Sequence, residues 1–151
     1  MRFLVTDECK RLSRWMRLAG YDVELTPAVP LSVLYRRAYN EGRLVVTRNR
    51  RVKPSGLFRV VIIASHQLEG QLKQLVREAG LRIDATRLFS RCDRCNVELK
   101  GIEKPMVKTR VPSYVYQTQE DFYACPSCQR IYWAATHYER AVTFFQRVQD
   151  A

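Results

Sequence analysis

Short apolar runs alternate with amphipathic stretches along the first 90 residues. Four of the apolar runs are typical of buried strands and occupy residues 2–6, 21–25, 43–47 and 58–65. Apolar residues recur at helical spacing in three other stretches, which predicts helices over 8–19, 30–42 and 68–79. Parallel strands need a crossover connection, which a helix usually supplies. The pattern therefore predicts an α/β fold, a three-layer arrangement around a mainly parallel sheet.

Positive charge follows directly after the third predicted strand. The run Leu44–Val46 is followed by a basic cluster made of Arg48, Arg50, Arg51 and Lys53. In an open parallel sheet, ligands bind outside the carboxyl ends of the strands. Residues 6–8 and 65–67 end two further strands, and we expect them to reach the same edge as the basic cluster.

The first predicted helix adds to this positive charge. Lys10, Arg14 and Arg17 follow one another at helical spacing on the side away from Leu12, and Arg11 lies alongside. A solvated basic face is the simplest interpretation of this helix taken alone. Together with the basic cluster, it predicts a track for RNA phosphates, in which arginine forks grip phosphate oxygens and lysine supplies charge.

The overall charge favours a polyanionic partner. The chain has 151 residues and a formal charge of +11, and residues 1–90 carry 17 Lys and Arg against 8 Asp and Glu. No apolar run approaches the roughly 20 residues that span a bilayer, and the first residues lack the apolar core of a signal peptide. We therefore expect a cytoplasmic protein with reduced cysteines and no membrane partner.

Two C-x2-C pairs lie in the last third of the chain: Cys92 and Cys95, then Cys125 and Cys128. Four thiolates in tetrahedral array are the ligands of structural zinc, and because protein fills all four positions this metal is not expected to be catalytic. We expect short alternating strands in 111–125, which gives a zinc ribbon. The predicted division is an α/β domain over 1–90, then the ribbon and a C-terminal helix over 91–151, while Cys9 is expected in the core.

Several segments together resemble a known family. "FLVTDECKRLSRWMRLAGYD", "EGRLVVTRNR", "RCDRCN" and "CPSCQRIYWAATH" are similar to the Mut-seven C-terminal ribonuclease domain, over about residues 2–140. The resemblance implies a PIN-like fold with a zinc ribbon, in which carboxylates hold divalent metal for RNA cleavage. Asp7 matches the first acidic position of the family. Two other acidic positions are lost, because the chain has "VPLS" at the second helix and Asn49 where the family has an aspartate.

Three functions remain open. The first is an RNA-binding protein with a depleted carboxylate site, which grips structured RNA, ribosomal or transfer, at the strand ends. The alternative is an active ribonuclease, in which Asp7 and other carboxylates hold Mg²⁺ or Mn²⁺. The third is a module whose ribbon docks a protein. His66 and His137 could serve in metal-independent proton transfer or in structural hydrogen bonds, and the ribbon aromatics Tyr114, Tyr116, Tyr132 and Trp133 could stack on bases or pack in a core.

Overall fold

A four-stranded parallel sheet forms the centre of the molecule in the computed structural model, which describes residues 1–150 except for the side chain of Thr136. The strand order is β2-β1-β3-β4, and Val5 pairs with Leu25 on one side and Val46 on the other. The strands are β1 (Arg2–Thr6), β2 (Asp22–Thr26), β3 (Leu44–Thr47) and β4 (Val60–Ile62). The predicted parallel α/β sheet is confirmed, although β4 is shorter than the apolar run at 58–65.

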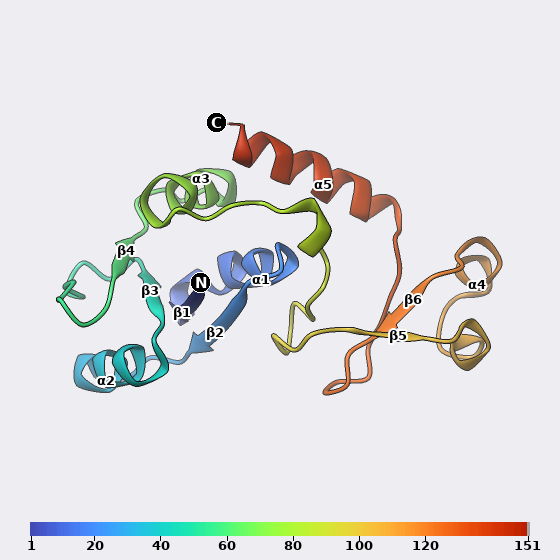
Figure 1. The fold of residues 1–151 in the computed structure, drawn as a ribbon, viewed down its shortest axis with the longest axis horizontal. Coiled ribbons are helices and arrows are strands. Elements are labelled where there is room, and N and C mark those ends of the chain that lie inside the picture. Colours follow the sequence, from blue (N-terminus) through green and yellow to red (C-terminus); the bar gives the residue numbers. More distant parts are fainter. Residues whose placement is uncertain (151) are drawn as a thin grey trace.

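Helices cover both faces of this sheet (Figure 1). Phe3 and Val5 pack into a core with α1 and α3, whereas the intervening Leu4 packs with α2 on the opposite face. This alternation follows from the two-residue period of a strand. The helices are α1 (Lys10–Leu18), preceded by a 3-10 turn at Asp7–Cys9, then α2 (Leu31–Glu41) and α3 (Leu68–Ala79). As expected, Cys9 is a core residue.

The region after residue 90 forms a second, antiparallel sheet in the order β5-β6-β7. Its elements are β5 (Lys100–Ile102), β6 (Phe122–Ala124), β7 (Ile131–Tyr132), the helix α4 (Ser113–Thr118) and a 3-10 helix at Lys104–Val107. The prediction of strands throughout 111–125 is therefore wrong for 113–118. Val111 and Val115 lie four residues apart, a helical spacing, and both pack in the small core of this region.

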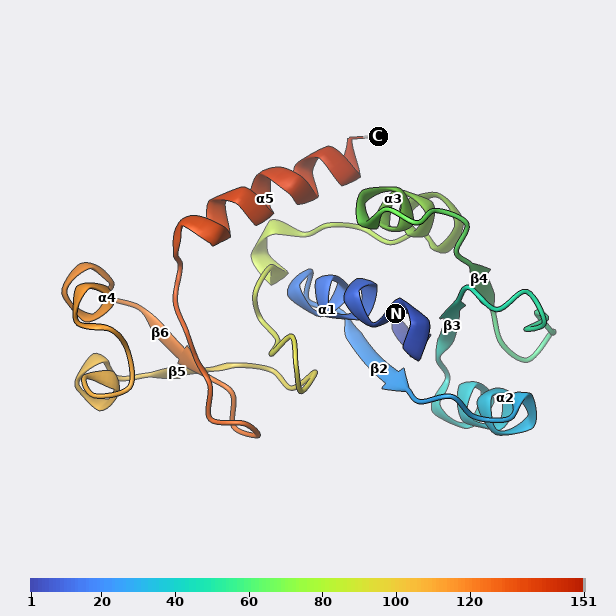
Figure 2. The same ribbon diagram turned by 180° about the vertical axis from the view of Figure 1, so that it is seen from behind.

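The C-terminal helix α5 (Thr136–Gln149) returns from the ribbon to the α/β part (Figure 2). Phe145 and Val148 are fully buried in the same core as Leu72 and Leu75 of α3. The ring of Trp15 on α1 lies 4.8 Å from that of Phe144. The last helix thus completes the layer formed by α1 and α3. In the sequence, the ribbon is flanked by the first C-x2-C turn and by α5, and both of these segments pack on the α/β part.

Candidate nucleic-acid interface and metal centre

Glu8 joins the carboxyl ends of β1 and β3. Its Oε1 atom accepts hydrogen bonds from the Thr6 hydroxyl (2.5 Å), the Thr47 hydroxyl (2.7 Å) and the backbone N–H of Arg48 (2.9 Å). Partial burial would raise the pKa of Glu8, but these three hydrogen bonds outweigh it and lower the pKa. The site therefore contains one firmly held, ionised carboxylate at neutral pH.

Arg48 extends the same polar arrangement to the end of β4. One terminal nitrogen of its guanidinium group donates to the carbonyl of Ser65 at 2.9 Å, and the other lies 3.0 Å from Nδ1 of His66. The backbone and the side chain of one residue thus connect all three strand ends. The structure brings together the three segments that the sequence predicts at this edge.

The remaining cations of the basic cluster point to solvent. Arg50, Arg51 and Lys53 are exposed. The backbone N–H of Arg51 donates to Oδ1 of Asn49, and that of Lys53 to the hydroxyl of Tyr35. The loop is therefore shaped through its backbone, and its charged side chains stay available to a ligand. Lys10 and Arg11, which follow directly after Glu8 and Cys9, are exposed too. We call this set of exposed or partly exposed cations the strand-end rim: Lys10, Arg11, Arg48, Arg50, Arg51 and Lys53.

Arg17 is not part of this exposed surface, contrary to the prediction from helical spacing. It is 6% exposed, and its guanidinium group donates to the carbonyls of Val23, Asp93 and Arg94. Arg14 is partly exposed, but it binds the Asp93 carboxylate through two nitrogens, at 2.9 and 2.5 Å. The reason is that the first C-x2-C turn covers this side of α1. Both arginines therefore connect the ribbon to the α/β part.

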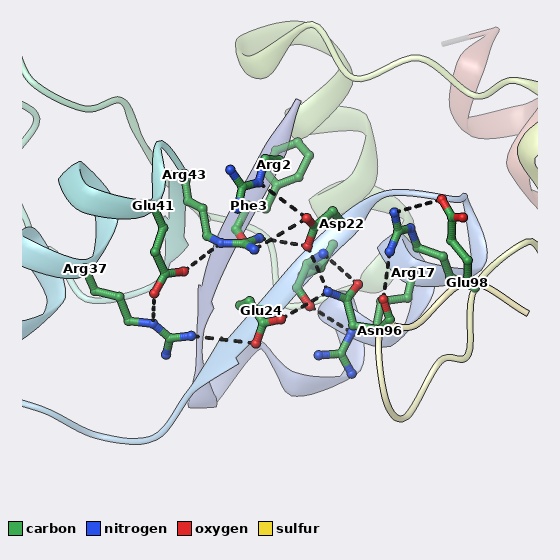
Figure 3. A network of polar contacts seen from close by, with 12 residues as sticks. Arg2, Phe3, Arg17, Asp22, Glu24, Arg37, Glu41, Arg43, Asn96 and Glu98 are labelled. Carbon is green, nitrogen blue, oxygen red and sulfur yellow. Dashed lines mark hydrogen bonds and ion pairs between the residues drawn. The ribbon is translucent and has the colours of Figure 1, made fainter. Parts of the chain in front are cut away.

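The same turn also covers the outer edge of the sheet. Strand β2 is an edge strand, and the N–H of Val23 on that edge donates to Oδ1 of Asn96 at 2.8 Å. The side-chain amide of Asn96 donates in turn to Asp22 and Glu24 (Figure 3). Asn96 adopts a positive φ of 64°, which asparagine tolerates better than most residues. The turn thus satisfies a backbone donor that would otherwise be unpaired.

An ion-pair network joins this edge to the amino ends of the strands (Figure 3). The buried guanidinium group of Arg43 bridges the carboxylates of Asp22 and Glu41, each at 2.8 Å. Partial burial would raise the pKa of Asp22, but hydrogen bonds from Arg43 and Asn96 outweigh it and lower the pKa to about 2. Arg37 pairs with Glu41 and Glu24. These carboxylates are engaged here and not at the strand-end rim.

The four cysteines form a compact cluster that fits a zinc ion. Their Sγ atoms all lie within 4.8 Å of one another, and those of Cys92 and Cys128 are 3.8 Å apart. Zinc–sulfur bonds of about 2.3 Å in a tetrahedron place two sulfurs about 3.8 Å apart. The turn also provides a backbone donor, since the N–H of Cys128 points at Sγ of Cys125. The geometry and the chemistry of the donors therefore suit Zn²⁺.

Tyr132 connects this cluster to the contact with α1. Its hydroxyl lies 3.0 Å from Sγ of Cys92 and donates to Oδ1 of Asp93 at 2.9 Å. Burial and these two partners raise the pKa of Tyr132, so the hydroxyl remains a donor. The other oxygen of Asp93 is the one that binds Arg14. Three hydrogen bonds thus connect the metal centre to α1.

The ribbon aromatics differ in their surroundings. Tyr116 and Trp133 pack against the small ribbon core, and Tyr132 is held at the metal centre. Tyr114 is 70% exposed, and Tyr123, which the sequence did not single out, is 46% exposed. These last two rings are the most exposed of the ribbon aromatics. His137 is exposed as well.

Acidic side chains are few at the strand ends. Asp7 is exposed and follows β1 directly, next to Glu8. Within residues 1–150, the four cysteines are the single group of three or more Cys, His, Asp or Glu side chains whose ligand atoms come within 4.8 Å of one another.

Asp93 and Asn96 were not singled out from the sequence. Their position inside or next to a C-x2-C pair was the available signal, but their partners on α1 and β2 are more than 70 residues away.

Comparisons with known proteins give one match. The Mut7-C RNAse domain family matches residues 1–145, which is nearly the whole chain. Neither the curated proteins nor the solved structures include a match to this chain. Among the helices of residues 1–150, none has both the length and the apolar character needed to cross a membrane.

Proposed function

Because the chain belongs to the Mut7-C RNAse domain family, we propose that it binds RNA through the strand-end rim. The observation that carries the proposal is the accessible positive charge that follows both β1 and β3 in the sequence, at the edge where parallel sheets bind ligands. Arg48 is held in place by Ser65, whereas Arg50, Arg51 and Lys53 project into solvent. Such a combination suits phosphate oxygens.

The proposal includes a depleted carboxylate site. Asn49 stands where the resemblance places an aspartate, and it supplies a neutral amide oxygen. Several oxygen ligands are needed to hold Mg²⁺ or Mn²⁺, and the positive charges of the strand-end rim disfavour a divalent cation there. Structured RNA, ribosomal or transfer, is the proposed partner, because its dense phosphates match a rim that is formed by several segments.

The test replaces Arg50, Arg51 and Lys53 together by alanine. Binding to a labelled pool of transfer RNA should weaken at least tenfold at 100 mM salt. The slope of log affinity against log salt should fall by about 2 to 3, since each phosphate contact contributes about 0.7 to 0.9. A matched control removes three exposed arginines outside the rim, at positions 77, 82 and 140. Equal effects of the two triple variants would refute the rim as the binding surface.

The family description also supports an active ribonuclease as a second candidate. In this case Asp7, exposed beside Glu8, would hold Mg²⁺ or Mn²⁺ together with carboxylates or RNA oxygens. Cleavage should then require one of these ions and disappear in Asp7→Asn. Cleavage that Asp7→Asn leaves intact would exclude this role.

A further inference from the structure

Glu8 and His66 both contact Arg48. An ionised carboxylate and an imidazole therefore lie at the two ends of one arginine whose guanidinium group is fixed. The carboxylate contacts the backbone of Arg48, and the imidazole contacts the tip of its side chain. We propose that these three residues form a metal-independent site that cleaves RNA by transesterification. This inference rests on the proposed RNA binding and adds a reaction to it.

The reaction needs no metal because RNA carries its own nucleophile, the 2′-hydroxyl group. Glu8 takes the proton of this hydroxyl, and the 2′-oxygen forms a bond to phosphorus. The bond between phosphorus and the 5′-oxygen of the next nucleotide breaks, and His66 donates a proton to that oxygen. The products are a 2′,3′-cyclic phosphate and a 5′-hydroxyl, and no oxidation or reduction takes place. Arg48 stabilises the negative charge that develops on the phosphate oxygens.

Glu8 is suited to the role of base by the way it is held. The hydrogen bonds from Thr6, Thr47 and the Arg48 N–H all reach Oε1, so they orient the carboxylate without engaging Oε2. These donors also lower the pKa of Glu8, which keeps the carboxylate in its ionised, proton-accepting form. A structural carboxylate would more commonly pair with a cationic side chain. Here the partners are two hydroxyls and an amide.

Arg48 is suited to hold the phosphate, and His66 to protonate the leaving 5′-oxygen. The bond to Ser65 fixes the guanidinium group, while His66 is exposed and can reach a ligand. A phosphodiester bound between the two side chains contacts the guanidinium group and the imidazole together.

The experiment incubates the full-length, zinc-loaded protein with a 5′-labelled random-sequence RNA in buffer free of Mg²⁺ and Mn²⁺. Mass spectrometry of the products should show 2′,3′-cyclic phosphate and 5′-hydroxyl ends. Glu8→Gln and His66→Ala should each lower the rate at least 100-fold, since an acid or base contributes about 10² to 10⁴. Glutamine retains the acceptor that Thr6 and Thr47 need, so Glu8→Gln should fold.

The control is His137→Ala, an exposed histidine elsewhere in the chain, which should cleave at the wild-type rate. Because contaminating ribonucleases give the same products, equal cleavage by wild type, Glu8→Gln and His66→Ala would overturn the proposal. So would products with 5′-phosphate ends, or no cleavage at all. Binding to a fully 2′-O-methylated RNA, which cannot react, separates the two ideas. If this RNA binds while ordinary RNA stays intact, the cleavage is refuted and RNA binding stands; if it does not bind, the proposed function itself fails.

Discussion

Replacement of Asn96 by glycine tests whether the first C-x2-C turn stabilises the α/β sheet. Glycine accepts the positive φ of 64° at this position, so the variant removes the side chain without adding backbone strain. The buried N–H of Val23 loses its acceptor, which costs about 1–3 kcal/mol, and the lost bonds to Asp22 and Glu24 add about 1 kcal/mol. We expect a net loss of about 2–4 kcal/mol in the free energy of unfolding. For a chain of this size that corresponds to a fall in Tm of about 5–10 °C.

The second C-x2-C turn offers a matched control. Gln129 occupies the corresponding position, also at a φ of 64°, and its backbone N–H bonds Cys125 as that of Asn96 bonds Cys92. Its side chain is exposed and bonds the carbonyl of Pro126 within the same turn. Gln129→Gly should therefore leave the stability nearly unchanged or slightly raised. The assay is urea and thermal unfolding of the zinc-loaded proteins by far-UV circular dichroism, and equal stabilities of the two variants would refute the coupling.

Three further outcomes follow from the same structure. Gly20→Ala should destabilise the protein strongly, because φ is 87° and an added Cβ would lie 2.5 Å from the carbonyl oxygen of Arg87. Gly80→Ala, at a φ of 72° with open space around it, should lower the free energy of unfolding much less in the same assay. Metal analysis should find one zinc per chain, and Cys128→Ser should lower its retention against a chelator. The folded pKa of Asp22 is about 2, below its unfolded value of about 3.9, so its contribution to stability is present above pH 4 and is lost as the pH falls toward 2. The stability gap between wild type and Asp22→Asn should accordingly narrow over that range, and a gap that does not change with pH would contradict this role.

The elements of the α/β part were predictable because local signals agreed with one another. Apolar runs of strand length, helical periodicity and glycines at the helix ends all indicated the same alternation, and β1, β2 and β3 formed at the expected positions. The meeting of three strand ends followed from the parallel sheet. The four cysteines were identified by their spacing alone, because two C-x2-C pairs in one chain have few interpretations other than a metal site.

The roles of Arg14 and Arg17 could not be read from the helix that carries them. Their helical spacing is identical to that of a solvated basic face, and the contacts that engage them come from Asp93 and Arg94, more than 75 residues away. The helix α4 was missed for a related reason. Its six residues are too few to show a clear periodicity, and the helix is stabilised by packing of Val115 against Phe122 in the ribbon core.

The position of α5 has a consequence for how the chain folds during synthesis. Phe145 and Val148 are the last large side chains of the central core, and both come after the whole ribbon. While residues 136–149 are still inside the ribosome, the apolar side chains of α1 and α3 that pack on α5 are uncovered, and Trp15 lacks its aromatic neighbours. The emerging protein must therefore remain an open intermediate until residues 136–149 have left the ribosome. A chain truncated just before this helix would keep the sheet but expose apolar core residues, so it would be prone to aggregation.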